Sequence, residues 1–137
     1  MECYLFVYGT LLSSFQNLMS AFVQKHAVWQ GQARIRGRLY EVSYYPGAVA
    51  DPAADTWIRG ELYLVPDSQV LFEVLDEYEG YFPDLPDNSL FIRTRVQAHP
   101  DGGQPPLEAW MYQFNRPADH LHWIASGDFL AYERSRK

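Results

Sequence analysis

Short apolar and aromatic runs, separated by glycine and proline, constrain the fold of this chain more than any other feature. The first run, Cys3 to Val7, fits a buried strand. The segments 37–42, 60–65 and 107–114 have the same strand-forming character. Regular alternation of strands and helices is missing from the pattern, which disfavours a doubly wound fold. We therefore expect an α+β protein with about six strands in a mostly antiparallel sheet or small barrel.

Two segments have the apolar spacing of an amphipathic helix. In segment 13–25 apolar residues recur every three or four positions, and Ser13 followed by Gln16 predicts a capping box at its start. A second helix is predicted over 67–78, with an aspartate as its N-cap and Gly80 ending it. With one more short helix, these segments give two or three helices beside the sheet.

Turn and breaker residues assign further segments. Tyr45-Pro46-Gly47 predicts a turn, because proline fixes one dihedral angle and glycine is free to adopt a positive one. Pro117 predicts the start of a short helix within 115–124, and residues 133–137 are expected to be a frayed tail. A chain of 137 residues is long enough for one core, so we expect a single domain over 1–137.

Composition and charge exclude several classes of protein. Hydrophobic residues make up 47% of the chain, which excludes a disordered protein. The net charge of -6 argues against a nucleic-acid or anionic-membrane partner. Arg34, Arg36 and Arg38 alternate as residues on the solvent face of a strand do, and a phosphate-binding patch is the alternative interpretation.

Cysteine usage and the N-terminus predict a cytoplasmic protein. Cys3 is the one cysteine, interpreted as a small buried hydrophobe, so an internal disulfide is excluded. Met1-Glu2 lacks the positive start of a signal peptide, and no apolar stretch reaches the roughly 18 residues of a membrane span. His120 and His122 lack further ligands at zinc spacing, so no metal site is expected.

Two features combine into a candidate site. The first strand stops at Gly9, where the backbone N–H groups of residues 9–11 can hold a carboxylate or a developing oxyanion. In the second helix Glu79 follows Leu75 by four residues and falls at the edge of the apolar face, whereas the other acidic residues of the helix point away from it. Loss of hydration raises the pKa of such a carboxylate toward the working range of a general base.

Each feature also has a simpler interpretation. A strand-end glycine more often allows the close approach of a neighbouring strand than of a ligand. A glutamate near a helix end is more often a surface or capping residue. Glu79 paired with Asp76 or Glu77 would suit glycoside hydrolysis, but the helical angles direct these side chains apart.

Short motifs follow one another along nearly the whole chain. They are Phe6-Val7-Tyr8-Gly9-Thr10-Leu11, Gly37-Arg38-Leu39-Tyr40, Tyr45-Pro46-Gly47, Gly60-Glu61-Leu62-Tyr63, Leu75-Asp76-Glu77-Tyr78-Glu79-Gly80, Ala109-Trp110-Met111-Tyr112 and Ser126-Gly127-Asp128-Phe129. In this order they resemble the gamma-glutamylcyclotransferase-like family, which includes gamma-glutamylamine cyclotransferases and bacterial and plant members. The resemblance implies a small mixed β-barrel with flanking helices and a cavity.

The resemblance also implies an enzyme and its reaction. The glutamate immediately before the glycine is the family's acid/base, which implies this role for Glu79. The family's loop binds substrate through main-chain groups, which implies a binding role for Tyr8, Gly9, Thr10 and Leu11. The α-amino group of a small γ-glutamyl amine or γ-glutamyl amino acid attacks its own γ-carbonyl, and 5-oxoproline forms as the amine leaves. Neither a metal nor an organic cofactor is implied.

Two residues depart from the family pattern, and alternatives in function remain open. Phe91 stands where many members have a tyrosine, and Phe129 where members have a tryptophan after Gly-Asp. The loop 81–89 is the expected determinant of the leaving amine. One alternative is a non-catalytic module that binds a small ligand or has a regulatory role on the same barrel. Another is an enzyme that removes an acyl chain in secondary metabolism, again by cyclisation of a γ-glutamyl group.

Overall fold

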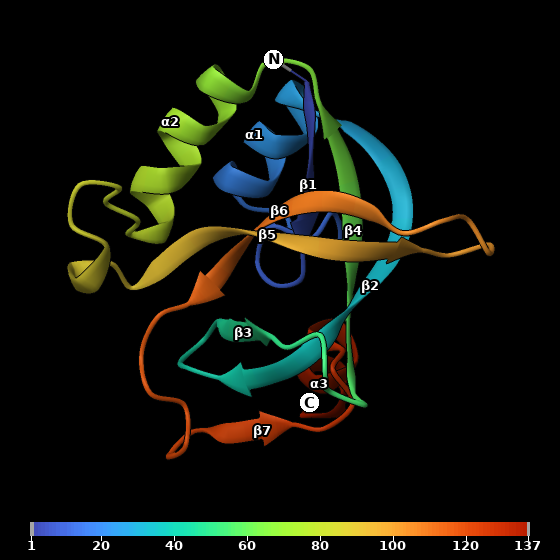
Figure 1. Cartoon of the computed structure of the whole chain (residues 1–137), viewed down its shortest axis with the longest axis vertical. Helices are drawn as coiled ribbons and strands as arrows, with labels where there is room; N and C mark the ends of the chain where they lie inside the picture. Colours follow the sequence, from blue (N-terminus) through green and yellow to red (C-terminus); the bar gives the residue numbers. More distant parts are fainter. Residues whose placement is uncertain (1, 137) are drawn as a thin grey trace.

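The computed structural model describes residues 2–136, which contain seven strands, three α-helices and a 3₁₀ turn at Pro86–Asn88. The strands are β1 (Cys3–Val7), β2 (Val28–Glu41), β3 (Pro46–Ala50), β4 (Trp57–Val65), β5 (Phe91–Pro100), β6 (Leu107–Phe114) and β7 (His122–Ile124). The helices are α1 (Leu18–His26), α2 (Ser68–Glu79) and α3 (Phe129–Ser135). Figure 1 shows these elements in chain order, from blue to red.

Five of the strands close into a mixed barrel. Their order is β1-β4-β2-β3-β6, and β6 returns to β1. The contacts of β6 with β1 and β3 are parallel, and the remaining pairings are antiparallel. Outside the ring, β5 pairs with β6 and β7 pairs with the end of β2. The predicted α+β class with a mixed, mostly antiparallel barrel is confirmed, with seven strands in place of about six.

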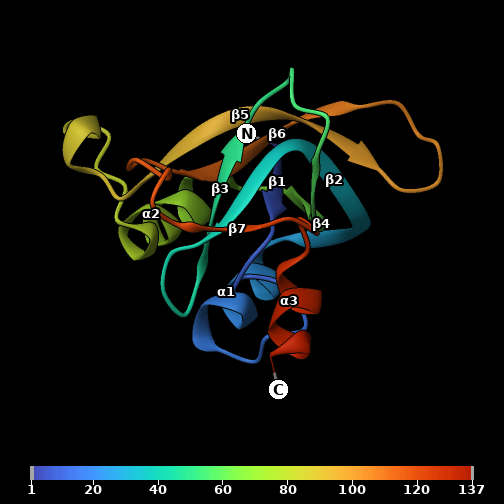
Figure 2. The same cartoon turned by 90° about the horizontal axis from the view of Figure 1, so that it is seen from below.

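The helices lie around the barrel rather than between its strands. In Figure 1, α1 and α2 lie near the start of β1, and α3 lies at the other end beside β7. Figure 2 shows that α1 and α3 project from the same side of the sheet, opposite the β5–β6 hairpin. Residues at the C-terminal end of α2 and residues that follow β1 line the same cavity.

Alternation along β1 divides the core into two clusters. Leu5 and Val7 point toward the helices, whereas Phe6 and the following Tyr8 point into the barrel, as the period of two in a strand requires. The first cluster includes Val23 of α1 and Leu71 and Leu75 of α2, and the second includes Ile35, Leu39, Ile58 and Met111. Each side of β1 is therefore buried, so the strand is apolar throughout.

The predicted first helix begins too early in the chain. Asn17 is the N-cap of α1, and it forms a capping box with Ser20 in place of the box predicted from Ser13 and Gln16. The backbone N–H and hydroxyl of Ser13 instead donate to the buried carboxylate of Glu61, at 2.7 and 2.8 Å. Helical spacing of apolar residues also occurs where a bent loop buries them, which explains the error.

The predicted turn at Tyr45-Pro46-Gly47 is shifted by about two residues. The chain bends at 43–45, and Pro46 and Gly47 already belong to β3, where Gly47 is paired with Tyr40. Gly47 does not adopt a positive φ. A Cβ atom there would lie 2.8 Å from Phe114, so this glycine serves close packing between strands.

The predicted helix within 115–124 is also wrong. The chain forms the short strand β7 at its end, where Ile124 pairs with Leu39 and is 2% exposed. The predicted tail from 133 is in fact helical to Ser135, because Asp128 caps α3 and Phe129 is buried beneath it. Lys137 lies outside the described residues.

Two other predictions concern membrane-spanning helices and the cysteine Cys3. Within residues 2–136, no helix has the length and apolar character to cross a membrane. Cys3 is half-buried and not part of a disulfide. Burial raises the pKa of its thiol, which fits a residue that packs rather than reacts.

Candidate active site

A half-open cavity of about 230 Å³ lies between the chain following β1, the end of α2 and the walls of β5 and β6. The lining residues are Phe6, Val7, Tyr8, Gly9, Thr10, Leu11, Tyr44, Tyr45, Pro46, Tyr78, Glu79, Leu90, Phe91 and Tyr112. All five residues predicted for the site are among them. Glu79 is the one acidic residue in this set, and the set contains no lysine, arginine or histidine.

Gly9, Thr10 and Leu11 form a turn that closes with a 2.9 Å hydrogen bond from the N–H of Leu12 to the carbonyl of Gly9. The carbonyl of Thr10 accepts a hydrogen bond from the Asn17 side chain at 2.9 Å. In the part of the chain that the structure describes, no group accepts a hydrogen bond from the N–H of residues 9, 10 or 11. The turn is thus fixed through its carbonyls, and its N–H groups are available for an anion.

Tyr8 contributes its ring to the cavity but not its hydroxyl. The hydroxyl donates to the carbonyl of Tyr112 at 2.7 Å and accepts from the N–H of Ala48 at 3.2 Å. Burial, together with the nearby Glu79 carboxylate, holds the pKa of Tyr8 well above its ordinary value. Its hydroxyl therefore fixes the barrel wall, and any contact of Tyr8 with substrate is limited to its ring and main chain.

Gly9 is required by a close approach of the chain itself. A Cβ atom at this position would lie 2.8 Å from Cγ and 2.9 Å from Cδ of Pro46. Pro46 opens β3 and also lines the cavity. This glycine therefore permits close contact with a neighbouring strand, and it also lines the cavity.

The last turn of α2 presents Glu79 to the cavity, as its angle to Leu75 predicts. Asp67 caps the start of the helix, where its side chain accepts a hydrogen bond from the N–H of Val70. Gly80 ends the helix in the left-handed conformation, with φ of 69°. The carbonyl of Gly80 then accepts from the N–H of Leu90, which anchors the loop 81–89 at its base.

Glu79 is half-buried, and its pKa is raised from 4.5 to about 7. The cause is loss of hydration in an apolar and aromatic cavity. No hydrogen-bond donor to this carboxylate is found among residues 2–136. A carboxylate that titrates near neutral pH is suited to accept and return a proton.

Asp76 was predicted to point away from the interior, and this is wrong. Its side chain is only 16% exposed and pairs with Arg93 through contacts of 3.0 and 3.3 Å. The hydroxyl of Tyr112 donates to the same carboxylate at 2.6 Å. Arg93 and Tyr112 face each other across β5 and β6, so only the strand register reveals this cluster.

The two departures from the family pattern have different positions. Phe91 is 3% exposed, lines the cavity and packs on Tyr45 and Phe114, so the wall is apolar where a tyrosine would add a hydroxyl. Phe129 packs on Phe15 in the core and is not among the cavity-lining residues. Its substitution therefore affects packing rather than the cavity.

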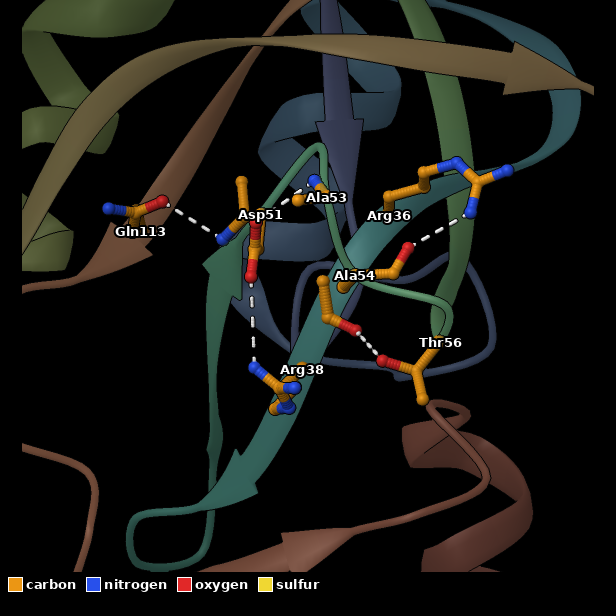
Figure 3. A network of polar contacts seen from close by, with 9 residues as sticks. Arg36, Arg38, Asp51, Ala53, Ala54, Thr56 and Gln113 are labelled. Carbon is orange, nitrogen blue, oxygen red and sulfur yellow. Dashed lines mark hydrogen bonds and ion pairs between the residues drawn. The ribbon is translucent and has the colours of Figure 1, made fainter.

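The arginines of β2 face solvent and contact their own chain. Figure 3 shows Arg36 donating to the carbonyl of Ala54, at 2.9 Å, and Arg38 beside Asp51, at 3.8 Å. Arg34 and Arg36 also lie over the ring of Trp57. This agrees with the predicted solvent-exposed face of the strand.

Metal-binding residues are not clustered in the described part of the chain. Within residues 2–136, no group of three or more histidine, cysteine, aspartate or glutamate side chains is arranged to hold a metal ion. His122 belongs to β7, and its ring stacks on Tyr132.

Fold and cavity together define a small mixed β-barrel whose cavity is lined by one carboxylate and by a turn whose N–H groups have no acceptor among residues 2–136. A model of the family described as "Gamma-glutamyl cyclotransferase, AIG2-like" matches residues 5–131. The chain belongs to this family of cyclotransferase-like enzymes. A curated relative, the gamma-glutamylcyclotransferase family protein YtfP of Escherichia coli K12, is 32% identical over 133 residues, covering 92% of this chain and 95% of YtfP.

Solved structures show the same fold at lower identity. YkqA from Bacillus subtilis has a TM-score of 0.73 and 24% identity, and the match covers 99% of this chain but only 42% of YkqA. An AIG2-like protein from mouse has a TM-score of 0.70 and 22% identity, covering 93% of this chain and 88% of that protein. These likenesses support the fold.

Proposed function

We propose that the protein is a γ-glutamyl cyclotransferase that releases 5-oxoproline from a small γ-glutamyl amine or γ-glutamyl amino acid, with Glu79 as its acid/base. The observation that carries this proposal is the pairing, in one cavity, of a carboxylate whose pKa is raised to about 7 with the N–H groups of residues 9–11. Membership of the family supports the reaction class.

The reaction begins with proton transfer to Glu79. The ionised carboxylate takes a proton from the α-ammonium group of the γ-glutamyl moiety, which frees the nitrogen lone pair. Because Glu79 has a pKa of about 7, it is largely ionised just above neutral pH and still basic enough to share this proton. The apolar walls formed by Phe91 and Leu90 limit the contact of the reacting groups with water on one side of this half-open cavity.

Ring closure follows within the substrate. The α-nitrogen attacks the γ-carbonyl carbon, and a new C–N bond forms as the carbonyl oxygen gains negative charge. In this proposal the N–H groups of Gly9, Thr10 and Leu11 hold the substrate carboxylate or this oxyanion, supported by their place in the cavity lining and by the lack of an acceptor for them among residues 2–136. Glu79 then gives its proton to the leaving nitrogen, and the original amide C–N bond breaks. The ring nitrogen passes its second proton to the Glu79 carboxylate, and 5-oxoproline and the amine depart.

The leaving group would exit past the exposed side of the cavity. Tyr44 and Tyr78 line the cavity and are 79% and 46% exposed, so they form its rim. They are therefore candidates, together with the loop 81–89, for contact with the leaving amine.

The test is an assay of 5-oxoproline and amine release from a panel of γ-glutamyl amines and γ-glutamyl amino acids. We expect turnover by the wild-type protein and a loss of at least about 100-fold in Glu79→Gln, the lower range for removal of a general base. Glu77→Gln is the matched control, because Glu77 lies on the same helix but is exposed. Undiminished turnover in Glu79→Gln would refute the mechanism. Binding of glutamate-like compounds without product from any substrate would instead support a binding module.

A further inference from the structure

A second carboxylate lies one turn before Glu79 on α2 and is held in a different way. Asp76 receives two contacts from the guanidinium of Arg93 and a third from the hydroxyl of Tyr112. Arg93 is itself confined, with its guanidinium carbon 4.2 Å from the ring centre of Phe72 and 4.8 Å from that of Trp110. Asp76 is thus neutralised by a cation that has little freedom to leave.

The contact between Asp76 and Tyr112 determines where the tyrosine hydroxyl points. Tyr112 lines the cavity together with Glu79 and is 4% exposed. Its O–H has one proton to donate, and this proton is used at 2.6 Å on Asp76. Residues three apart on a helix are neighbours, and Glu79 lines the same cavity as Tyr112, so Glu79 is the other carboxylate near this hydroxyl.

We propose that Asp76 is a positioning residue, which together with Arg93 holds the Tyr112 hydroxyl away from Glu79 and so leaves Glu79 without a hydrogen-bond donor. A carboxylate that accepts a hydrogen bond is stabilised in its ionised form and is a weaker base. The cluster therefore preserves the basicity that proton transfer requires. This inference rests on the proposed function only for its catalytic consequence, because the hydrogen bonding can be measured without turnover.

Other ionisable groups also face Glu79, and they do not supply a donor. Tyr8 uses its hydroxyl on the Tyr112 carbonyl. Tyr45, from the bend between β2 and β3, lies in the same cavity, and burial raises the pKa of its hydroxyl, with smaller contributions from Tyr44 and Glu79.

The experiment follows the carboxyl carbon of Glu79 by NMR during a pH titration, with the signal assigned from Glu79→Gln. In Asp76→Ala the Tyr112 hydroxyl is free to donate to Glu79, and we expect the pKa of Glu79 to fall by about one unit or more. Part of this fall in the Glu79 pKa comes from loss of the negative charge of Asp76. The double variant Asp76→Ala/Tyr112→Phe lacks the same charge and is therefore the comparison. The double variant lacks the hydroxyl, and its Glu79 pKa should be about one unit higher than in Asp76→Ala. The acid limb of the turnover rate, plotted against pH, should move in parallel.

Equal pKa values of Glu79 in Asp76→Ala and in the double variant would overturn the inference. Tyr112→Phe alone keeps the pair of Asp76 and Arg93, so it decides the matter even if Asp76→Ala does not fold. We expect Tyr112→Phe to leave the Glu79 pKa unchanged, and a rise of about one unit would show that the hydroxyl already binds Glu79. If the wild-type protein releases no 5-oxoproline, the proposed function fails, while the titration still decides the role of Asp76.

Discussion

Replacing Glu79 with glutamine is expected to stabilise the folded protein at alkaline pH. The pKa of this carboxyl rises from 4.5 in the unfolded chain to about 7 in the cavity, so the folded state favours its protonated form. Below pH 4.5 Glu79 is protonated in both states and does not change the free energy of unfolding. As the pH rises from 4.5 toward 7 its ionisation lowers the stability of the wild-type protein, and above pH 7 the full destabilisation is present.

The size of the effect follows from the same two pKa values. At 1.36 kcal/mol for each pKa unit, ionising Glu79 costs the folded state about 3 kcal/mol if the cavity excludes water. Water entering the half-open cavity screens the charge, so we expect about 2 kcal/mol. Glutamine has nearly the same shape and no charge, and the variant should avoid this cost.

Denaturant unfolding of the wild type and Glu79→Gln at pH 4 and pH 8.5, at fixed ionic strength, measures this difference. We expect equal free energies of unfolding at pH 4 and a variant that is about 2 kcal/mol more stable at pH 8.5. The control Glu77→Gln should change the free energy of unfolding by the same amount at both pH values, because Glu77 is exposed. A difference between wild type and Glu79→Gln that does not change with pH would refute the burial of an uncompensated carboxylate.

Three further predictions concern turnover and the loop after β1. The turnover rate should fall about tenfold for each pH unit below 7, because Glu79 must be ionised to accept a proton, and a pH-rate profile without an acid limb near 7 would contradict this. Gly9→Ala should destabilise the protein by about 1–3 kcal/mol and raise KM, because the new Cβ would lie 2.8 Å from Pro46. Calorimetry and kinetics should show that Gly9→Ala/Pro46→Ala recovers part of the lost stability and of the KM. If the double variant recovers neither, the contact with Pro46 is not the cause. Glu61→Ala should lower the free energy of unfolding, measured with denaturant, by about 2–3 kcal/mol and should raise KM. The reason is that Ser13 loses both hydrogen bonds that fix the chain after the Gly9–Leu11 turn. An unchanged KM would show that these hydrogen bonds do not position the turn.

Local patterns predicted the elements that carry the site. The run Cys3 to Val7 is β1, and the offset of four residues between Leu75 and Glu79 was enough to direct Glu79 inward. Both follow from short-range geometry, the period of two in strands and of 3.6 in helices. The class of fold and the location of the cavity could therefore be predicted from the sequence.

Features that depend on distant pairing could not be predicted in this way. Asp76 has the angle of a surface residue on its own helix, and it is buried only because Arg93 and Tyr112 are in register on β5 and β6. In the same way, Ser13 has the local pattern of a helix cap, but it donates its hydrogen bonds to Glu61 on β4 instead. Tertiary hydrogen bonds decided both positions, and no window of neighbouring residues contains their partners.

Mass spectrometry of a reaction run in ¹⁸O-labelled water tests the central claim most directly. Intramolecular attack by the α-nitrogen introduces no oxygen from water, whereas hydrolysis adds one. We predict that the wild-type protein converts a γ-glutamyl amine to unlabelled 5-oxoproline and an equal amount of free amine, and that Glu79→Gln does not. Release of ¹⁸O-labelled glutamate, or of unlabelled 5-oxoproline at the same rate by Glu79→Gln, would contradict the account.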